Sequence, residues 1–185
     1  LPRMCLAARF SLLKNIRSRR SRVVDVVDAA TRSRMMAGIK SRDTKPEVLV
    51  RHGLHARGFR YRLQSGDLPG KPDVVLPKWR TVVFVHGCFW HWHGCALSKL
   101  PGNNAAFWLK KLETNRQRDD LVRRQLLADG WRVAVVWECA TRGARAAVAL
   151  PRVLDQLAQW IRASRRSKFF EIGNALVARM ETSPR

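Results

Sequence analysis

The chain has 185 residues, a length that fits one domain of ordinary size. Lys and Arg number 36 against 14 Asp and Glu, so the formal net charge is +22, while hydrophobic residues make up 46% of the sequence. This apolar fraction excludes wholesale disorder, and no apolar run approaches the roughly 18 to 20 residues that a transmembrane helix needs. The charge favours nucleic acid as the partner, because each neutralised phosphate releases counterions. A ribosomal-type or membrane-surface protein is the alternative.

The N-terminal segment differs in composition from the rest of the chain. Residues 1–24 carry seven basic groups and no acidic group. We expect them to be a disordered basic extension, with an Arg- and Ser-rich transit peptide as the alternative. The four Cys are too few for a disulfide-stapled secreted domain, so we expect a reducing, cytoplasmic setting in which Cys beside His indicates metal binding.

The pattern of apolar residues and turn signals predicts an α/β fold, with a mixed sheet flanked by helices. Thr44 is suited to cap the second helix, Glu47 completes a capping box, and Gly58 ends that helix. The third helix separates two apolar strands, which predicts a crossover and parallel pairing. The main domain should span 25–164, followed by a C-terminal tail at 165–185. The expected helices are 25–40, 44–57, 105–128 and 147–164, and the expected strands are 59–63, 73–76, 81–85 and 131–137.

A short turn after the second expected strand predicts an antiparallel hairpin. If that turn is centred between Lys78 and Trp79, Asp73 pairs near Phe84. The start of one strand then lies beside the end of the next. We therefore expect the Asp73 carboxylate close to His86.

The segment 86–95 is rich in metal-ligating residues, with two Cys and three His within ten positions. A further cysteine, Cys139, follows the last expected strand. Cys88, His93, Cys95 and Cys139 would supply three thiolates and one imidazole, a closed tetrahedral set that suits structural zinc. The alternative is that these Cys are only small buried hydrophobes.

Several motifs resemble the very-short-patch repair endonucleases of bacteria. The resemblance covers about residues 25–162 and is most specific in the string HGCFWH with its distal Cys. The motifs are ATRS at 30–33, SRDT at 41–44, GKPD at 70–73, FVHGCFWH at 84–91, FWL at 107–109, Asn115 with Asp119, and GWRVAVVWEC at 130–139.

This resemblance implies a restriction-endonuclease-like fold and a nick beside the T of a T:G mismatch, the product of 5-methylcytosine deamination. It implies a magnesium-dependent bacterial enzyme with the zinc site described above. We expect a nucleoid-associated monomer in the cytoplasm that acts on double-stranded DNA, with other mismatch-repair proteins as further partners and no membrane contact.

The resemblance also assigns the metal-binding residues of the active site. Asp73 matches the catalytic aspartate that binds Mg²⁺, a hard cation that takes oxygen ligands. Val85 would lend its backbone carbonyl to the same ion. Glu47 matches a helix glutamate that holds water on the metal, although a capping partner of Thr44 would also be a glutamate.

The usual metal-nuclease set of two acids and a Lys is absent around Asp73, and histidines take the place of the Lys. His91 matches the general base that activates the attacking water, a task suited to a neutral imidazole. His86 matches its supporting partner. Asp119 would orient one of these histidines or assist water on the metal, with a solvated helix face as the alternative.

Three aromatic residues, Phe89, Trp90 and Trp108, match a wedge that enters the duplex beside the mismatch, where unstacking costs least. The alternative is that they are ordinary core aromatics.

Two further pairs match residues that contact DNA. Met36 and Ile39 fall where the family inserts apolar side chains from the minor groove, and Lys111 and Asn115 match base-reading positions. Two other functions stay open: a zinc-stabilised DNA-binding module without catalysis, and a metal nuclease of the same fold with another DNA substrate.

Overall fold

The computed structural model describes residues 28–38, 42–63, 66–102, 104–142, 146–163, 167–173 and 179–182. Within these ranges no helix is long and apolar enough to cross a membrane. Two predictions fall elsewhere, because the basic extension 1–24 and Ile39 lie outside the described residues. Met36 lies on the first helix, but its side chain is also outside the description.

The centre of the molecule is a mixed five-stranded sheet with strand order β1-β2-β3-β4-β5. Its strands are β1 (Val74–Leu76), β2 (Thr81–His86), β3 (Arg132–Trp137), β4 (Ser167–Ile172) and β5 (Arg179–Thr182). The three central strands run parallel, whereas β1 and β5 pair antiparallel with their neighbours. The predicted crossover between β2 and β3 is confirmed.

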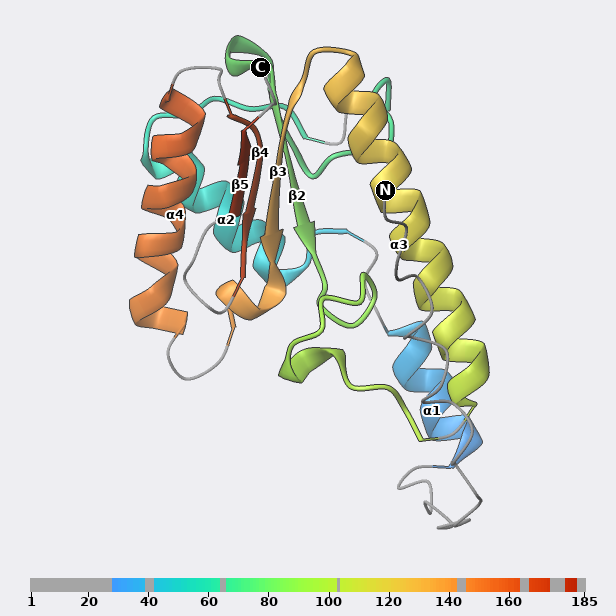
Figure 1. Cartoon of the computed structure of the whole chain (residues 1–185). Coiled ribbons are helices and arrows are strands. Elements are labelled where there is room, and N and C mark those ends of the chain that lie inside the picture. The colour runs from blue at the N-terminus through green and yellow to red at the C-terminus, as the bar shows by residue number, and fades with distance from the viewer. Residues whose placement is uncertain are drawn as a thin grey trace, which may run out of the picture.

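Helices cover both faces of this sheet, which confirms the expected restriction-endonuclease-like α/β arrangement. Figure 1 shows α2 (Lys45–Ala56) and α4 (Ala146–Arg162) on one face and α3 (Ala105–Ala128) on the other. The first helix, α1 (Ala29–Ala37), is shorter than the predicted 25–40. The long α3 has the predicted bounds, and Gly130 follows it with φ of +79°.

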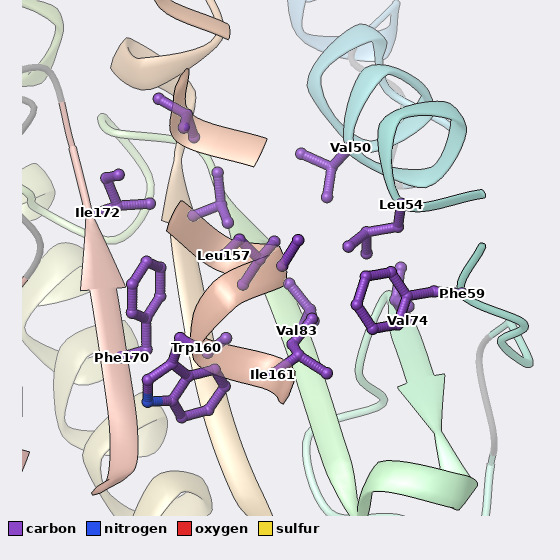
Figure 2. Close-up of a cluster of buried hydrophobic side chains, with 14 of the residues drawn as sticks. Val50, Leu54, Phe59, Val74, Val83, Leu157, Trp160, Ile161, Phe170 and Ile172 are labelled. Atoms are coloured by element: carbon purple, nitrogen blue, oxygen red, sulfur yellow. The ribbon is translucent and has the colours of Figure 1, made fainter. Parts of the chain in front are cut away.

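Two hydrophobic clusters hold the helices to the sheet. Under α2 and α4, Val50, Leu54 and Leu157 pack on inward-facing residues of the strands, and each is fully buried. Figure 2 shows this cluster, with Phe170 of β4 at its far side. Leu126 of α3 belongs to the cluster on the other face. Burial on both faces explains why the central strands are almost continuously apolar.

The β1–β2 hairpin has the predicted antiparallel register. Leu76 pairs with Thr81 and Val74 pairs with Val83, so Asp73 lies beside the end of β2. The turn closes through Arg80, whose left-handed φ of +47° lets the chain reverse after the short helix Pro77–Trp79.

The predicted strand 59–63 is wrong. In this segment only Arg62 forms a bridge, in which its N–H donates to the Val75 carbonyl at 2.8 Å and its carbonyl accepts from the Val75 N–H at 2.9 Å. Phe59 instead packs into the core directly after α2, with 2% of its surface exposed. The alternating pattern therefore reflected one core contact and one bridge, without a regular ladder.

The segment that we expected to form a C-terminal tail contributes strands to the sheet. β4 pairs parallel with β3, and its Phe169 and Phe170 are buried on opposite faces. The strand was missed because it is a short apolar run whose partners lie more than thirty residues earlier in the chain.

Candidate active site and metal centre

The parallel strands β2 and β3 end at a pocket that brings together the five residues predicted for catalysis and Val85, whose carbonyl was predicted to bind Mg²⁺. They come from α2, the start of β1, the end of β2, the following loop and α3. The pocket is lined by Glu47, Asp73, Val85, His86, His91 and Asp119, among other residues. The end of a strand ladder is the usual place for such a site in an α/β sheet.

Asp73 is held against the end of β2. Its Oδ2 accepts a hydrogen bond from the Val85 N–H at 2.7 Å, and no described residue donates to its other oxygen. Burial raises the pKa of Asp73 to about 6, and the nearby Glu47 carboxylate adds to this rise. A partly buried carboxylate, with one oxygen that accepts from no described residue and with a second acid nearby, is a donor set that fits a hard divalent cation.

Glu47 is a buried carboxylate with several donors around it. Its Oε1 accepts from the Thr44 hydroxyl at 2.7 Å, and its Oε2 accepts from the Asp43 N–H at 2.9 Å. Arg51, one turn later on α2, donates to Oε2 at 3.1 Å and also pairs with Asp43. The predicted capping box is therefore altered, because Glu47 reaches the residue before the N-cap and the Thr44 hydroxyl donates to Glu47.

His91 is fixed between a carboxylate and a second imidazole. Its Nδ1 lies 2.5 Å from Asp119 Oδ2, and its ring stacks on His86 with centroids 3.9 Å apart and planes 5° from parallel. Burial, with the neighbouring His91, lowers the pKa of His86 to about 3, so His86 is neutral. Parallel stacked rings do not aim their lone pairs at one point, so this trio is better suited to proton transfer than to holding a metal.

The predicted cysteine and histidine ligands form one cluster. One ligand atom from each of Cys88, His93, Cys95 and Cys139 lies within 4.8 Å of all the others. His93 presents Nδ1, which is 3.6 Å from Cys88 Sγ and 3.4 Å from Cys139 Sγ. The cluster could hold a metal ion, and the contacts identify Nδ1 as the imidazole ligand atom.

The surroundings of the cluster favour a cation. The Cys139 N–H donates to Cys88 Sγ at 3.3 Å, and the Leu97 N–H donates to Cys95 Sγ at 3.4 Å. Without a cation, the hydrogen bond to the Cys139 thiol and burial raise the pKa of Cys88. A bound divalent cation would reverse that rise, since a coordinated thiol loses its proton. The donor set Cys₃His fits a closed zinc site.

The three predicted wedge residues touch one another. The Phe89 ring meets Trp90 and Trp108 edge-on, with centroids 5.1 and 5.3 Å apart, and the two Trp rings are 6.0 Å apart. All three are partly exposed. Phe107 extends the group with 59% of its surface exposed. This aromatic cluster is therefore neither core nor isolated, and its first residue follows Cys88, a candidate metal ligand.

The two predicted base-reading residues on α3 have different surroundings. Lys111 is exposed, with its Nζ 5.9 Å from the Phe107 ring centroid. Asn115 donates from Nδ2 to the Trp90 carbonyl at 3.0 Å. Asn115 thus links α3 to the loop after β2 that carries Phe89 and Trp90. The sequence did not indicate this contact.

Sequence reasoning missed several residues that surround the site. Arg51 follows Glu47 by four positions, and this spacing could have suggested an ion pair on α2. Glu138 accepts from the Cys88 N–H at 3.3 Å and pairs with Arg142, and its place between Trp137 and Cys139 was the available signal. Glu171 lies on the unpredicted β4, so no signal pointed to it.

The chain is similar to proteins that act on DNA. A family model described as DNA mismatch endonuclease Vsr matches residues 24–97. The chain is 45% identical over 141 residues to the DNA mismatch endonuclease Vsr of Escherichia coli (strain K12), covering 75% of this chain and 88% of that protein. It is 48% identical over 117 residues to the type II nicking enzyme V.XorIIP of Xanthomonas oryzae pv. oryzae, covering 63% of this chain and 86% of that protein.

A mixed sheet with helices on both faces, and with a carboxylate and paired histidines where its strands end, fits the restriction-endonuclease-like class. The similarities narrow this class further, because one relative shares nearly half of the aligned positions over most of its own length. The chain belongs to the Vsr family of DNA mismatch endonucleases.

Proposed function

We propose that the protein is a magnesium-dependent endonuclease that nicks one DNA strand beside the T of a T:G mismatch and so starts very-short-patch repair. Family membership supports the coarser statement that it is a DNA-nicking hydrolase. The finer proposal rests on one observation. Asp73, Val85, His91 and Asp119 share a single pocket, with a carboxylate oxygen that accepts from no described residue on one side and an oriented imidazole on the other.

The metal-binding part of the pocket consists of Asp73, the Val85 carbonyl and Glu47. Asp73 and Val85 would hold Mg²⁺, and Glu47 would bind its hydration water. When bound, the ion supplies positive charge that stabilises the scissile phosphate and the leaving oxygen. The hydrogen bond from the Val85 N–H keeps the Asp73 side chain in place beside the end of β2. Arg51 pairs with Glu47, whose carboxylate also accepts hydrogen bonds from Asp43 and Thr44.

His91 is suited to act as the general base. The Asp119 carboxylate accepts a hydrogen bond from the Nδ1–H of His91, which leaves Nε2 as the basic nitrogen that takes a proton from the attacking water. Asp119 also stabilises the imidazolium that forms, as a buried acid does in other carboxylate–histidine pairs. The stacked His86 limits rotation of the ring and, being neutral, adds no opposing charge.

The aromatic cluster provides the means to recognise a mismatch. A mispaired step is easier to unstack, and the rings of Phe89, Trp90 and Trp108 can replace the lost stacking. Their mutual contacts keep them together at the surface. Asn115 anchors the Trp90 backbone, and Lys111 is exposed beside this cluster and available to a base edge.

The remaining parts of the proposal concern the setting of the reaction. A net charge of +22 favours binding to the phosphates of double-stranded DNA. We further propose that the protein acts as a monomer in the bacterial cytoplasm, on nucleoid DNA, together with other mismatch-repair proteins. The domain would span 25–164 together with β4, with 1–24 as a basic extension.

A nicking assay tests the proposal directly. Duplexes that differ only in one pair, T:G, T:A or C:G, are labelled on each strand separately and incubated with Mg²⁺ or with a chelator. We expect a single nick beside the T, on the T:G duplex alone and only with Mg²⁺. Binding without a nick would favour the DNA-binding module, and cuts in both strands or in paired duplexes would favour a nuclease with another substrate.

A further inference from the structure

Trp137 lies between the metal cluster and the catalytic histidines. It is the last residue of β3, where it pairs in the ladder with His86, and only 8% of its surface is exposed. Its ring stacks on His93 with centroids 4.2 Å apart and planes 14° from parallel. The same ring meets His86 edge-on, with centroids 5.4 Å apart. One indole therefore contacts both a cluster ligand and the imidazole that supports His91.

A residue of β4 fixes the orientation of that indole. Trp137 Nε1 donates to Glu171 Oε1 at 2.6 Å. A buried indole N–H needs an acceptor, and an ionised carboxylate is a strong one. Glu171 pairs in the ladder with Val135, two residues before Trp137, so both side chains lie on the same face of the sheet.

Gly173, the residue that follows β4, leaves room for the His93 ring because it has no side chain. A Cβ at Gly173 would lie 2.8 Å from His93 Cε1 and 2.9 Å from its Nε2, closer than the two groups can approach. The end of β4 therefore packs against His93 at Gly173 and holds Trp137 at Glu171.

We propose that Glu171 is a positioning residue for both centres. Its hydrogen bond holds the Trp137 ring in the one orientation that stacks on His93 and supports His86, which in turn stacks on His91. Loss of the bond frees the ring to rotate about its side-chain torsions. The His93 ring and the stacked rings of His86 and His91 then lose the indole that packs between them. The catalytic part of this inference rests on the proposed nicking function, whereas the part that concerns His93 does not.

Three variants test the role of the hydrogen bond. Glu171→Leu removes the acceptor, Glu171→Gln keeps a carbonyl oxygen that can accept from the indole, and Ile172→Val loosens the core on the opposite face of the same strand. Two quantities are measured for each variant. One is kcat and KM for nicking the T:G duplex with Mg²⁺, and the other is the rate at which zinc passes from the purified protein to a chromogenic chelator.

We expect Glu171→Leu to lower kcat and to speed zinc release, each by roughly 10-fold. This is the lower end of the effect of losing a residue bonded to a metal ligand, because Glu171 acts on His93 through Trp137. KM should stay within about twofold, since no DNA contact is removed. Glu171→Gln should restore both quantities to near the parent values. Ile172→Val should lower the melting temperature while kcat and zinc release stay near those of the parent.

A second set of variants addresses the pairing itself. Trp137→Phe keeps a ring but removes the N–H, and we expect it to be impaired like Glu171→Leu. The double variant should then be no worse than either single one, because both remove the same bond. Additive losses would overturn the proposal.

Other outcomes would also overturn it. These are parent-like behaviour of Glu171→Leu, equal loss in Glu171→Gln or Ile172→Val, and a purified parent protein without zinc. A parent protein that releases zinc as expected but does not nick the T:G duplex would instead refute the proposed function. The zinc-release rates of the variants would still decide the role of Glu171.

Discussion

Asp73 and His91 lie in one pocket but have different tasks. Asp73→Ala removes the proposed metal ligand and His91→Ala removes the proposed base. Neither task contributes much to binding in the ground state, so the loss should appear in the rate. We expect Asp73→Ala to show no detectable nicking and His91→Ala to lose roughly 10² to 10⁴ in kcat, with DNA affinity nearly unchanged. Single-turnover nicking and fluorescence anisotropy measure the two quantities. An Asp73→Ala protein that nicks at the parent rate would place the active site elsewhere.

Asp119 has a neighbour that serves as a matched control. Asp119 contacts His91 Nδ1, whereas Asp120 pairs with Arg123 and is more exposed. Asp119→Asn should lower kcat by at least about tenfold, because the amide no longer fixes the tautomer or stabilises the imidazolium. Asp120→Asn should stay near the parent rate, since exposed ion pairs contribute little. Equal kcat values for the two variants would contradict a role for Asp119 in orienting His91.

At the scale of elements, the loop after β2 depends on the cluster. Cys139 follows β3, whereas Cys88, His93 and Cys95 lie on the loop, so a bound ion would tie the loop to the sheet. We expect one zinc per chain in the purified protein, and Cys139→Ser should lose it and melt at a lower temperature as well as lose activity. Elemental analysis and a thermal melt give both numbers. A folded parent protein without zinc would refute the prediction.

The connection between β3, α4 and β4 depends on one buried arginine. Arg132, with 3% of its surface exposed, donates to the carbonyls of Trp160 at 2.6 Å, Ile161 at 2.9 Å and Ser167 at 3.2 Å. Its guanidinium also lies 4.0 Å from the Trp160 ring centroid. Arg132→Leu leaves these carbonyls without their donor and should lower the free energy of unfolding by about 3 to 5 kcal/mol.

A second arginine and a lysine variant sharpen this test. Arg152→Leu, on the exposed side of α4, should change the free energy of unfolding by less than about 0.5 kcal/mol. Arg132→Lys should recover little stability, since an ammonium cannot reach three carbonyls as a planar fork does. Urea denaturation measures all three variants. Equal midpoints for Arg132→Leu and Arg152→Leu would mean that these hydrogen bonds do not hold the strands together.

The elements differ in how far the sequence could predict them. The bounds of α3 and the β1–β2 hairpin follow from local signals, such as Gly130 after the helix and the turn at Pro77–Arg80. The four cluster residues were found because thiols and imidazoles are concentrated beside β2. Glu171 could not be found, because its partner Trp137 lies on a strand 34 positions away and nothing local indicates a buried hydrogen bond. The strand predicted at Phe59–Leu63 was wrong because alternating apolar residues indicate which side chains are buried. They do not show that the segment pairs with a neighbouring strand.

At the scale of the whole molecule, the charge is spread well beyond the catalytic domain. Residues 1–24 carry seven basic groups, and the family match begins at residue 24. A protein that starts at Val24 should nick with the parent kcat but bind DNA more weakly. Its salt dependence should be shallower, by about 0.9 in slope for each phosphate contact that is lost. Titrations at several salt concentrations, with nicking at saturation, measure both effects. A folded truncated protein that fails to nick would contradict this prediction.

The loop from Cys88 to Cys95 carries cluster ligands, two wedge residues and the proposed base in one unbroken run. Both ends of this loop belong to the same cluster. The number of residues between them therefore sets where the proposed base and the wedge residues lie relative to the cluster. Side chains in the run can vary one at a time, but an inserted or deleted residue would move the base and the wedge together. Natural divergence at this place should therefore take the form of substitution, while changes in length accumulate in other loops.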